Sequence, residues 1–320
     1  TGFVGSHVVD VLLARGLDVS YIARATSNHR WLTGKPVTLV EGSLHDLGSL
    51  HRALDGVDVV IHVAGQTAGR NEADFLRGNQ GATQNLIDAV RTYRPNLTRF
   101  VHISSMAVNG PAKDEEHPNR EDMPLHPITA YGRTKKLAEQ VIHEASADIP
   151  CTIIRPPAVY GPRDEATLTF FAAVAKGLSP LIGFDNKKVS LVHIRDLARG
   201  IVDASFHEKT VGETYFISSD EFYTWREIAD VTASVTGRKR LLTIRLPHPL
   251  VLAIAGTSGA LGRFSKKPPV LDYEKGIDMI QRYWICSTEK AHHDFGYKQE
   301  ISLEEGILET VSWYRAQGWL

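Results

Sequence analysis

Short apolar runs alternate with segments of helical periodicity through the first half of the chain. The continuous runs predict strands that are buried on both faces, at residues 19–23, 37–41, 57–63, 100–104 and 152–155. Between them, apolar residues spaced three and four apart predict helices at residues 5–15, 47–54, 82–93 and 131–146. Such alternation implies right-handed crossovers and a parallel sheet covered on both faces. The predicted fold class is therefore α/β, with a doubly wound parallel sheet.

The alternation breaks after Gly161, where prolines divide the chain into shorter pieces, although residues 191–204 still predict a strand followed by a helix. We therefore expect a nucleotide-binding domain over residues 1–165 and 189–218. A smaller, partly interleaved substrate region is expected over residues 166–188 and 219–320. The apolar stretch 250–261 is too short to cross a bilayer, which takes about 20 residues. Its main interpretation is a buried helix, and a surface resting on a membrane is the alternative.

Composition excludes several classes of protein. The 320 residues are 42% hydrophobic and 23% charged, which is ordinary for a globular enzyme, and the net charge of −1 offers no basic field for nucleic acid or an anionic membrane. Two cysteines, Cys151 and Cys286, provide no disulfide framework and fit a reducing cytoplasm. No metal site is expected, because none of the 14 histidines has the spacing of zinc ligands, and the neighbours His292 and His293 are interpreted as surface residues.

A glycine turn stands at the head of the alternating pattern. Gly2 and Gly5 are separated by Phe3 and Val4. Glycine permits a tight turn and lets the backbone approach a dinucleotide pyrophosphate, whose charge then lies at the N-terminus of the following helix. A dinucleotide fold has a buried strand immediately before this turn. Because the sequence starts at Thr1, we expect that this strand has been lost from it.

The residue at the end of the second strand of such a fold selects the cofactor. A carboxylate there binds the adenosine ribose of NAD, whereas a cation accommodates the extra phosphate of NADP. This chain has Arg24, with Ser27 and Asn28 as further donors and no acidic residue in the segment YIARATSN. The sequence therefore favours NADP(H), with NAD(H) as the alternative.

Candidate catalytic residues follow two later elements. Ser104 and Ser105 end the strand 100–104, at the carboxyl edge of the sheet where ligands bind in this class of fold. Tyr131 begins a helix, and Lys135 lies on the same face one turn later. An isolated tyrosine has a pKa of about 10, so we expect the ammonium and a positive nicotinamide to lower it. Tyr131 could then exchange a proton with a substrate oxygen that Ser105 orients.

Six segments together resemble the extended short-chain dehydrogenases/reductases of the NAD(P)-dependent epimerase/dehydratase family, over nearly all of the chain. They are TGFVGSH at 1–7, HVAG at 62–65, NQGATQNL at 79–86, ISSM at 103–106, YGRTK at 131–135 and RPPAVYGPRD at 155–164. The resemblance implies a Rossmann-type doubly wound sheet and a homodimer. By the same resemblance, Ser105, Tyr131 and Lys135 match the catalytic triad.

The resemblance also implies which residues contact the cofactor. The expected set is Gly2, Phe3, Val4, Gly5, Arg24, Ser43, Leu44, Val63, Ala64, Gly65, Asn79, Ser104, Tyr131, Lys135, Pro156, Ala158 and Val159. Ser43 departs from the family, which often has an aspartate there to hold the adenine amino group. A serine hydroxyl can donate or accept a hydrogen bond but carries no charge.

Positions at which this chain differs from members of the family narrow the set of possible reactions. Met106 and Ala107 stand where sugar dehydratases have an acidic pair, and Val189 and Ser190 stand where nucleotide-sugar epimerases commonly have Arg-Asp. The segment 167–201 instead resembles the 3β-hydroxysteroid dehydrogenase and dihydroflavonol reductase branches. Apolar side chains in this region are expected to form a wall for a hydrophobic substrate: Phe170, Phe171, Leu181 and Phe184.

The leading interpretation is an NAD(P)-dependent oxidoreductase that interconverts a ketone and a secondary alcohol on a hydrophobic cyclic small molecule. The first alternative is a nucleotide-sugar epimerase with tightly bound NAD, for which Lys187 and Lys188 could contact a phosphate. The second is a dinucleotide-sensing protein without catalysis, which the joint presence of Ser105, Tyr131 and Lys135 disfavours.

Overall fold

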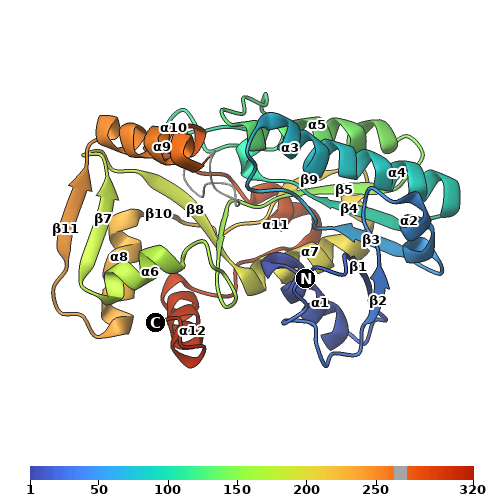
Figure 1. Ribbon diagram of the computed structural model, residues 1–320, viewed down its shortest axis with the longest axis horizontal. Helices are drawn as coiled ribbons and strands as arrows, with labels where there is room; N and C mark the ends of the chain where they lie inside the picture. Colours follow the sequence, from blue (N-terminus) through green and yellow to red (C-terminus); the bar gives the residue numbers. More distant parts are fainter. Residues whose placement is uncertain (263–271) are drawn as a thin grey trace.

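The computed structural model describes residues 1–262 and 272–320, and its N-terminal half alternates strand and helix as predicted (Figure 1). The elements in order are α1 (Phe3–Ala14), β1 (Ser20–Ala23), β2 (Thr38–Glu41), α2 (Leu47–Leu54), β3 (Val59–His62), α3 (Glu72–Leu76), the π-helix η1 (Arg77–Gly81), α4 (Ala82–Tyr93), β4 (Arg99–Ile103), the 3-10 turn η2 (Met106–Val108), α5 (Ala130–Ala145) and β5 (Cys151–Arg155). The predicted bounds of α2 and α4 are confirmed. Helix α1 begins two residues earlier than predicted, so Gly5 lies in its first turn rather than before it.

The strands of this half are all parallel, which confirms the predicted class of sheet. β3, β4 and β5 are followed in the sheet by β9 (Thr214–Phe216), whereas β1 and β2 form a separate pair. Among the described residues, β1 and β3 are each paired along one edge only.

Helices cover both faces of the four-stranded sheet. On one face, α1 and α7 (Ile194–Phe206) pack against the strands around Val101 and Ile154, which are completely buried. On the other face, α2, α4 and α5 enclose Phe100 and Ile153. The sheet edge that carries the ends of β3, β4 and β5 is thereby held rigidly, and the candidate active site lies along this edge.

The C-terminal half supplies a second layer. β8 (Lys188–His193) pairs with β6 (Ala158–Tyr160), β10 (Phe222–Thr224) and β12 (Tyr283–Trp284), and β7 (Leu178–Ile182) pairs with β11 (Leu242–Leu246). The remaining elements are α6 (Leu168–Ala175), the 3-10 turn η3 (Glu208–Thr210), α8 (Trp225–Thr236), α9 (His248–Gly262), α10 (Tyr273–Ile280), α11 (Glu289–Phe295) and α12 (Leu303–Ala316). β8 and α7 confirm the strand and helix predicted at 191–204.

The apolar stretch of the C-terminal half is not the buried helix that the sequence predicted. It forms α9, which packs with one side on α10: Val251 and Ala255 are buried, and the side chain of Ala255 lies close to Gly276. On the opposite side, Leu250 and Ile254 are 46% and 44% exposed. Of the helices described, none is both long and apolar enough to cross a membrane.

A buried ion pair fixes α5 on the sheet. The Arg155 guanidinium, at the end of β5, donates to both carboxylate oxygens of Glu139 on α5, with N–O distances of 2.9 and 2.7 Å. The two side chains are 3% and 1% exposed. Because one partner alone would be a buried, unpaired charge, the pair fixes the position of the helix that carries Tyr131 and Lys135.

Removing one partner of this pair tests that role. We expect Glu139→Ala to lower the free energy of unfolding by about 3–5 kcal/mol, since Arg155 is left buried without its counter-charge. The matched control is Asp230→Ala, which breaks the exposed i,i+4 pair with Arg226 on α8 and should cost at most about 1 kcal/mol. Urea denaturation of both variants measures the difference. Equal losses would show that the buried pair does not hold α5.

Candidate active site

The structure brings Ser105 and Tyr131 together. Ser105 follows β4 and begins η2, where its hydroxyl accepts a hydrogen bond from the backbone N–H of Ala107. Tyr131 is the second residue of α5, which begins after Thr129, whose hydroxyl accepts from the backbone N–H of Gly132 at 3.1 Å. The Ser105 hydroxyl lies close enough to the Tyr131 phenol to lower its pKa. Two elements separated in sequence therefore present adjacent hydroxyls.

Gly132 makes this contact geometrically possible. A Cβ atom at this position would lie 2.5 Å from the carbonyl oxygen of Ala107 and 3.0 Å from the Cβ of Pro127. No side chain fits at those distances, so the first turn of α5 lies directly against η2. The absence of a side chain at residue 132 therefore sets the separation between Tyr131 and Ser105.

Lys135 lies one helical turn beyond Tyr131 and is 3% exposed. Its Nζ donates to the carbonyl oxygen of Ile103 at 2.6 Å and lies 3.5 Å from Nε2 of His102. Burial lowers the pKa of Lys135 to about 8, so the ammonium is charged at neutral pH. An ammonium has three donors, and only one is engaged in a short hydrogen bond within the described residues. A second can reach Nε2 of His102, so one donor remains for a ligand.

The acid–base properties of Tyr131 differ from the sequence expectation. Burial raises the pKa of the Tyr131 phenol, and the Ser105 hydroxyl opposes this only in part. The expected lowering by Lys135 is not found in the protein without cofactor, where the Lys135 ammonium donates to the carbonyl of Ile103. The protein without cofactor thus keeps the phenol protonated, which suits donation of a proton to a substrate oxygen.

Gly65 and Asn79, which the sequence predicts to contact the cofactor, lie beside Lys135. A Cβ on Gly65 would lie 3.2 Å from Oδ1 of Asn79 and 3.7 Å from Nζ of Lys135, so glycine keeps this space open. Asn79, on η1, is oriented at both ends of its amide: Oδ1 accepts from the N–H of Gln66 at 2.7 Å, and Nδ2 donates to the hydroxyl of Thr134 at 3.0 Å. The sequence analysis missed Gln66 and Thr134, and their roles depend on a π-helix that no local pattern signals.

The predicted groove continues toward the glycine turn. The Cβ position of Gly5 lies 3.9 Å from the side chain of Val63, which follows β3. Phe3 and Val4 pack into the core beneath the turn. Gly2 caps α1 and has open space around its Cα, while Ala64 is exposed in the loop after Val63. This strip of small residues leaves the backbone accessible, which fits the approach of a dinucleotide pyrophosphate to a helix N-terminus.

Ser104 offers a further sign of a missing ligand. Its Oγ is buried and has no hydrogen-bond partner among the described residues. Buried polar groups are normally paired, so a ligand hydroxyl or amide next to β4 would complete the site.

Three further residues expected to contact the cofactor lie after the end of the neighbouring strand β5: Pro156, Ala158 and Val159. The carbonyl of Pro156 accepts from the N–H of Met106 at 2.9 Å, Val159 packs against the core, and Ala158 is exposed.

Arg24 and Ser43 line a cavity of about 350 Å³ at the end of β1 and β2, away from the catalytic hydroxyls. The same cavity contains Glu41, Asp46 and Arg52. The sequence expectation that no acidic residue stands near Arg24 is therefore wrong, because the chain folds β2 beside β1 and brings Glu41 to the same place. The carbonyl of neighbouring Leu44 accepts from Nδ2 of Asn85 at 2.9 Å. Two carboxylates and two guanidinium groups thus line the cavity that the sequence predicts to bind the adenosine end of the cofactor.

The expected apolar wall is not assembled as predicted. Phe171 and Leu181 are buried in the core, and Phe170 packs against Trp225. Phe184 points away from the core and is 74% exposed. These side chains stabilise the C-terminal layer or lie on its surface.

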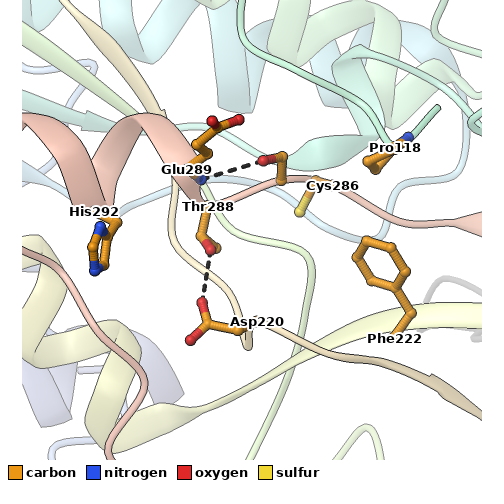
Figure 2. Close-up of a pocket in the computed structure, with 8 residues that line it drawn as sticks. Pro118, Asp220, Phe222, Cys286, Thr288, Glu289 and His292 are labelled. Carbon is orange, nitrogen blue, oxygen red and sulfur yellow. Dashed lines mark hydrogen bonds between the residues drawn. The ribbon is translucent and has the colours of Figure 1, made fainter. Parts of the chain in front are cut away.

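A second cavity, of about 330 Å³, was not anticipated from the sequence. Figure 2 shows its lining residues: Pro118, Asp220, Phe222, Cys286, Ser287, Thr288, Glu289 and His292. The hydroxyl of Thr288 donates to Asp220 at 2.8 Å, and burial raises the pKa of the Cys286 thiol to about 12. Such a thiol is a poor nucleophile. The described residues likewise contain no group of side chains suited to holding a metal ion.

The chain is similar to known proteins over nearly all of its length. Residues 1–224 match the NAD dependent epimerase/dehydratase family. The chain is 30% identical, over 100% of its own length and 94% of the relative, to ceramide reductase of Caulobacter vibrioides. It is 24% identical, over 96% of its length and 92% of the relative, to 4-hydroxy-2-methyl-3-oxo-4-farnesyl-3,4-dihydroquinoline-1-oxide ketoreductase of Stigmatella aurantiaca.

Among solved structures, the UDP-glucose 4-epimerase of Thermotoga maritima superposes with a TM-score of 0.80 at 22% identity, covering 99% of this chain and 96% of that chain. This likeness concerns the fold. The chain belongs to the NAD-dependent epimerase/dehydratase family, within the extended short-chain dehydrogenases/reductases. It is an NAD(P)-dependent oxidoreductase.

Filling the space at Gly132 tests whether the contact between η2 and α5 aligns the hydroxyls. We expect Gly132→Ala to lower kcat by about a hundredfold, because small misplacements of reacting groups cost that much, with little change in cofactor affinity. Gly256→Ala on α9 is the control, since its added Cβ meets nothing closer than 3.9 Å. Steady-state kinetics and cofactor titration measure both. A fully active Gly132→Ala protein would contradict the role of the contact.

Proposed function

We propose that this protein transfers hydride between a nicotinamide cofactor and the carbonyl carbon of a hydrophobic ketone, giving a secondary alcohol, or runs the reverse reaction. The observation that carries the proposal is the adjacency of the Ser105 and Tyr131 hydroxyls, with the buried ammonium of Lys135 one turn away. Two adjacent hydroxyls can hold one substrate oxygen atom, and the absence of a side chain at Gly65 leaves space beside Nζ of Lys135.

Ser105, Tyr131 and Lys135 have separate roles in the proposed reaction. When bound, the nicotinamide supplies or accepts the hydride. Ser105 donates a hydrogen bond to the carbonyl oxygen, and Tyr131 donates its proton to that oxygen as negative charge develops there. In the reverse direction the Tyr131 phenolate removes the proton of the alcohol. Lys135 holds the cofactor ribose with its remaining donor. The positive charge of an oxidised nicotinamide near the phenol would favour the phenolate.

Two lysines weigh against the epimerase alternative. Lys187 is 5% exposed and donates to Asp185 and to the carbonyls of Ile280 and Gln281. Lys188 forms an ion pair with Glu115. Both ammonium groups are thus committed within the protein and do not present a clamp for a nucleotide diphosphate. The hydroxyl of Ser190 likewise accepts from the N–H of Cys286.

The hydrophobic character of the substrate is supported by the relatives. The names of the two reductases contain ceramide, which is a lipid, and a farnesylated ring ketone. Both names denote molecules rich in hydrocarbon, and the ring in the second agrees with the cyclic substrate expected from the sequence. The homodimer, the cytoplasmic location and the domain boundaries expected from the sequence remain predictions.

Loss of the phenol tests the chemistry. We expect Tyr131→Phe to lower kcat by at least about a hundredfold, as is typical when a general acid is removed, while the Kd for the cofactor changes little because Lys135 remains. Tyr93→Phe, which changes a tyrosine 38% exposed on α4, is the control. Turnover is followed by nicotinamide absorbance and cofactor binding by fluorescence titration. Substantial turnover by Tyr131→Phe would exclude Tyr131 as the proton donor.

For the cofactor, we propose a preference for NADP(H), with Arg24 binding the adenosine phosphate despite Glu41 in the same cavity. A charge-assisted hydrogen bond contributes about 1.5–3 kcal/mol, so Arg24→Ala should raise the KM for NADPH about tenfold or more and leave that for NADH unchanged. The exposed Arg77, on η1 at a different part of the sheet edge, supplies the control Arg77→Ala. Equal effects on both cofactors, or a wild-type preference for NADH, would refute the assignment.

A further inference from the structure

One face of the two-stranded sheet β7–β11 is apolar throughout, and three of its six side chains are exposed. The parallel register pairs Leu178 with Leu242, Pro180 with Ile244 and Ile182 with Leu246. Paired residues of neighbouring strands point to the same side, so these six residues form one surface, here called the apolar sheet face. Leu242 is 65% exposed, Ile244 42% and Leu178 37%.

The opposite face of β7, in contrast, is covered by helices. Ser179 and Leu181 point to that side and are buried, where α6 and α8 pack against β7. Figure 1 shows β7 and β11 at the end of the molecule opposite to α2 and α4, with β11 outermost. The apolar sheet face therefore lies at one end of the molecule.

Further exposed apolar side chains extend this end. Phe184, in the loop after β7, is 74% exposed, and α9 follows directly after β11 with its own exposed pair, Leu250 and Ile254. Isolated exposed apolar residues are ordinary, but a contiguous apolar surface marks a site of interaction with another protein or a membrane.

Cations border the apolar sheet face. Lys176 lies two residues before β7, and Arg238, Lys239 and Arg240 lie two to four residues before β11, so all four lie at the same end of the parallel strands. Nε of Arg238 donates to the carbonyl of Ala175 at 2.5 Å, which confirms that the two segments meet. Residues 237–262 contain four arginine or lysine residues and no acidic one. None of these cations forms an ion pair within the described part of the chain.

We propose that this end of the molecule, the apolar sheet face with its bordering cations, docks on the surface of an anionic lipid bilayer. Apolar side chains enter the interface, and the cations contact phosphate headgroups. A second copy of this chain fits less well. In a two-fold contact the same surface faces itself, which would bring two sets of unpaired cations together around the contact.

The docking end is connected to the catalytic helix. α9 packs on α10 through Gly276, and Glu274 of α10 accepts from the N–H of Ala130, at the start of α5, and from Arg133 at 2.9 Å. Given the function proposed above, docking on a lipid surface would bring the enzyme close to lipid-like ketones. This link depends on that function, whereas the docking surface depends only on the face itself.

Vesicle flotation without cofactor or substrate tests the docking surface separately from the reaction. Wild-type protein should float with vesicles of phosphatidylcholine and phosphatidylglycerol and bind weakly to phosphatidylcholine alone. Leu242→Ser/Ile244→Ser should lose most of this binding, and Lys239→Glu/Arg240→Glu should lose at least about tenfold in partitioning, since each cation contributes to binding. Leu308→Ser and Arg315→Glu, both on α12, are the matched controls and should bind like the wild type.

Circular dichroism and ketone reduction by the variants verify that they are folded. Absence of wild-type binding to either vesicle would overturn the proposal, as would binding that the four substitutions leave unchanged. Sedimentation as a dimer that Leu242→Ser/Ile244→Ser converts to a monomer would assign the face to a second copy and also overturn it. If the wild-type enzyme reduced no ketone, the proposed function would be contradicted. The vesicle experiment would still test the docking surface independently.

Discussion

The close approach of α5 to the turn after β4 is the constraint on which the site depends. At Gly132 the helix backbone touches the carbonyl of Ala107, and no other residue type fits there. This contact places the Tyr131 phenol on the Ser105 hydroxyl, and helical geometry then places Lys135 one turn further along. The chemistry of the protein is thus arranged by the position of one helix on one sheet.

Buried charge fixes that helix and also limits what the site can do. The ion pair between Glu139 and Arg155 holds α5 against β5, while Lys135, equally buried, has only one short hydrogen bond. Burial raises the pKa of Tyr131 and lowers that of Lys135, so a protonated phenol lies one helical turn from an ammonium that keeps a donor for a ligand. Such an arrangement is ready to donate a proton to a carbonyl oxygen, and it needs a bound cation before the phenolate becomes favourable.

The local sequence predicted much of this arrangement. Buried apolar runs have few alternatives to parallel strands, so the order of elements and the positions of Ser105, Tyr131 and Lys135 followed from the pattern. Contacts between distant segments could not be predicted. Glu41 enters the Arg24 cavity only because β2 folds beside β1, and the exposure of Leu250 depends on which side of α9 meets α10. Likewise, the net charge of −1 for the whole chain gives no sign that residues 237–262 contain cations and no acidic residue.

The central claim is net hydride transfer at the Ser105–Tyr131 pair. The most direct test is to mix the protein with reduced nicotinamide cofactor and hydrophobic ketones, both cyclic and open-chain, and in parallel with sugar nucleotides. The account predicts loss of reduced-nicotinamide absorbance in stoichiometric proportion to the alcohol formed from a ketone. Interconversion of sugar isomers with no net change in absorbance, and no reaction with any ketone, would contradict it.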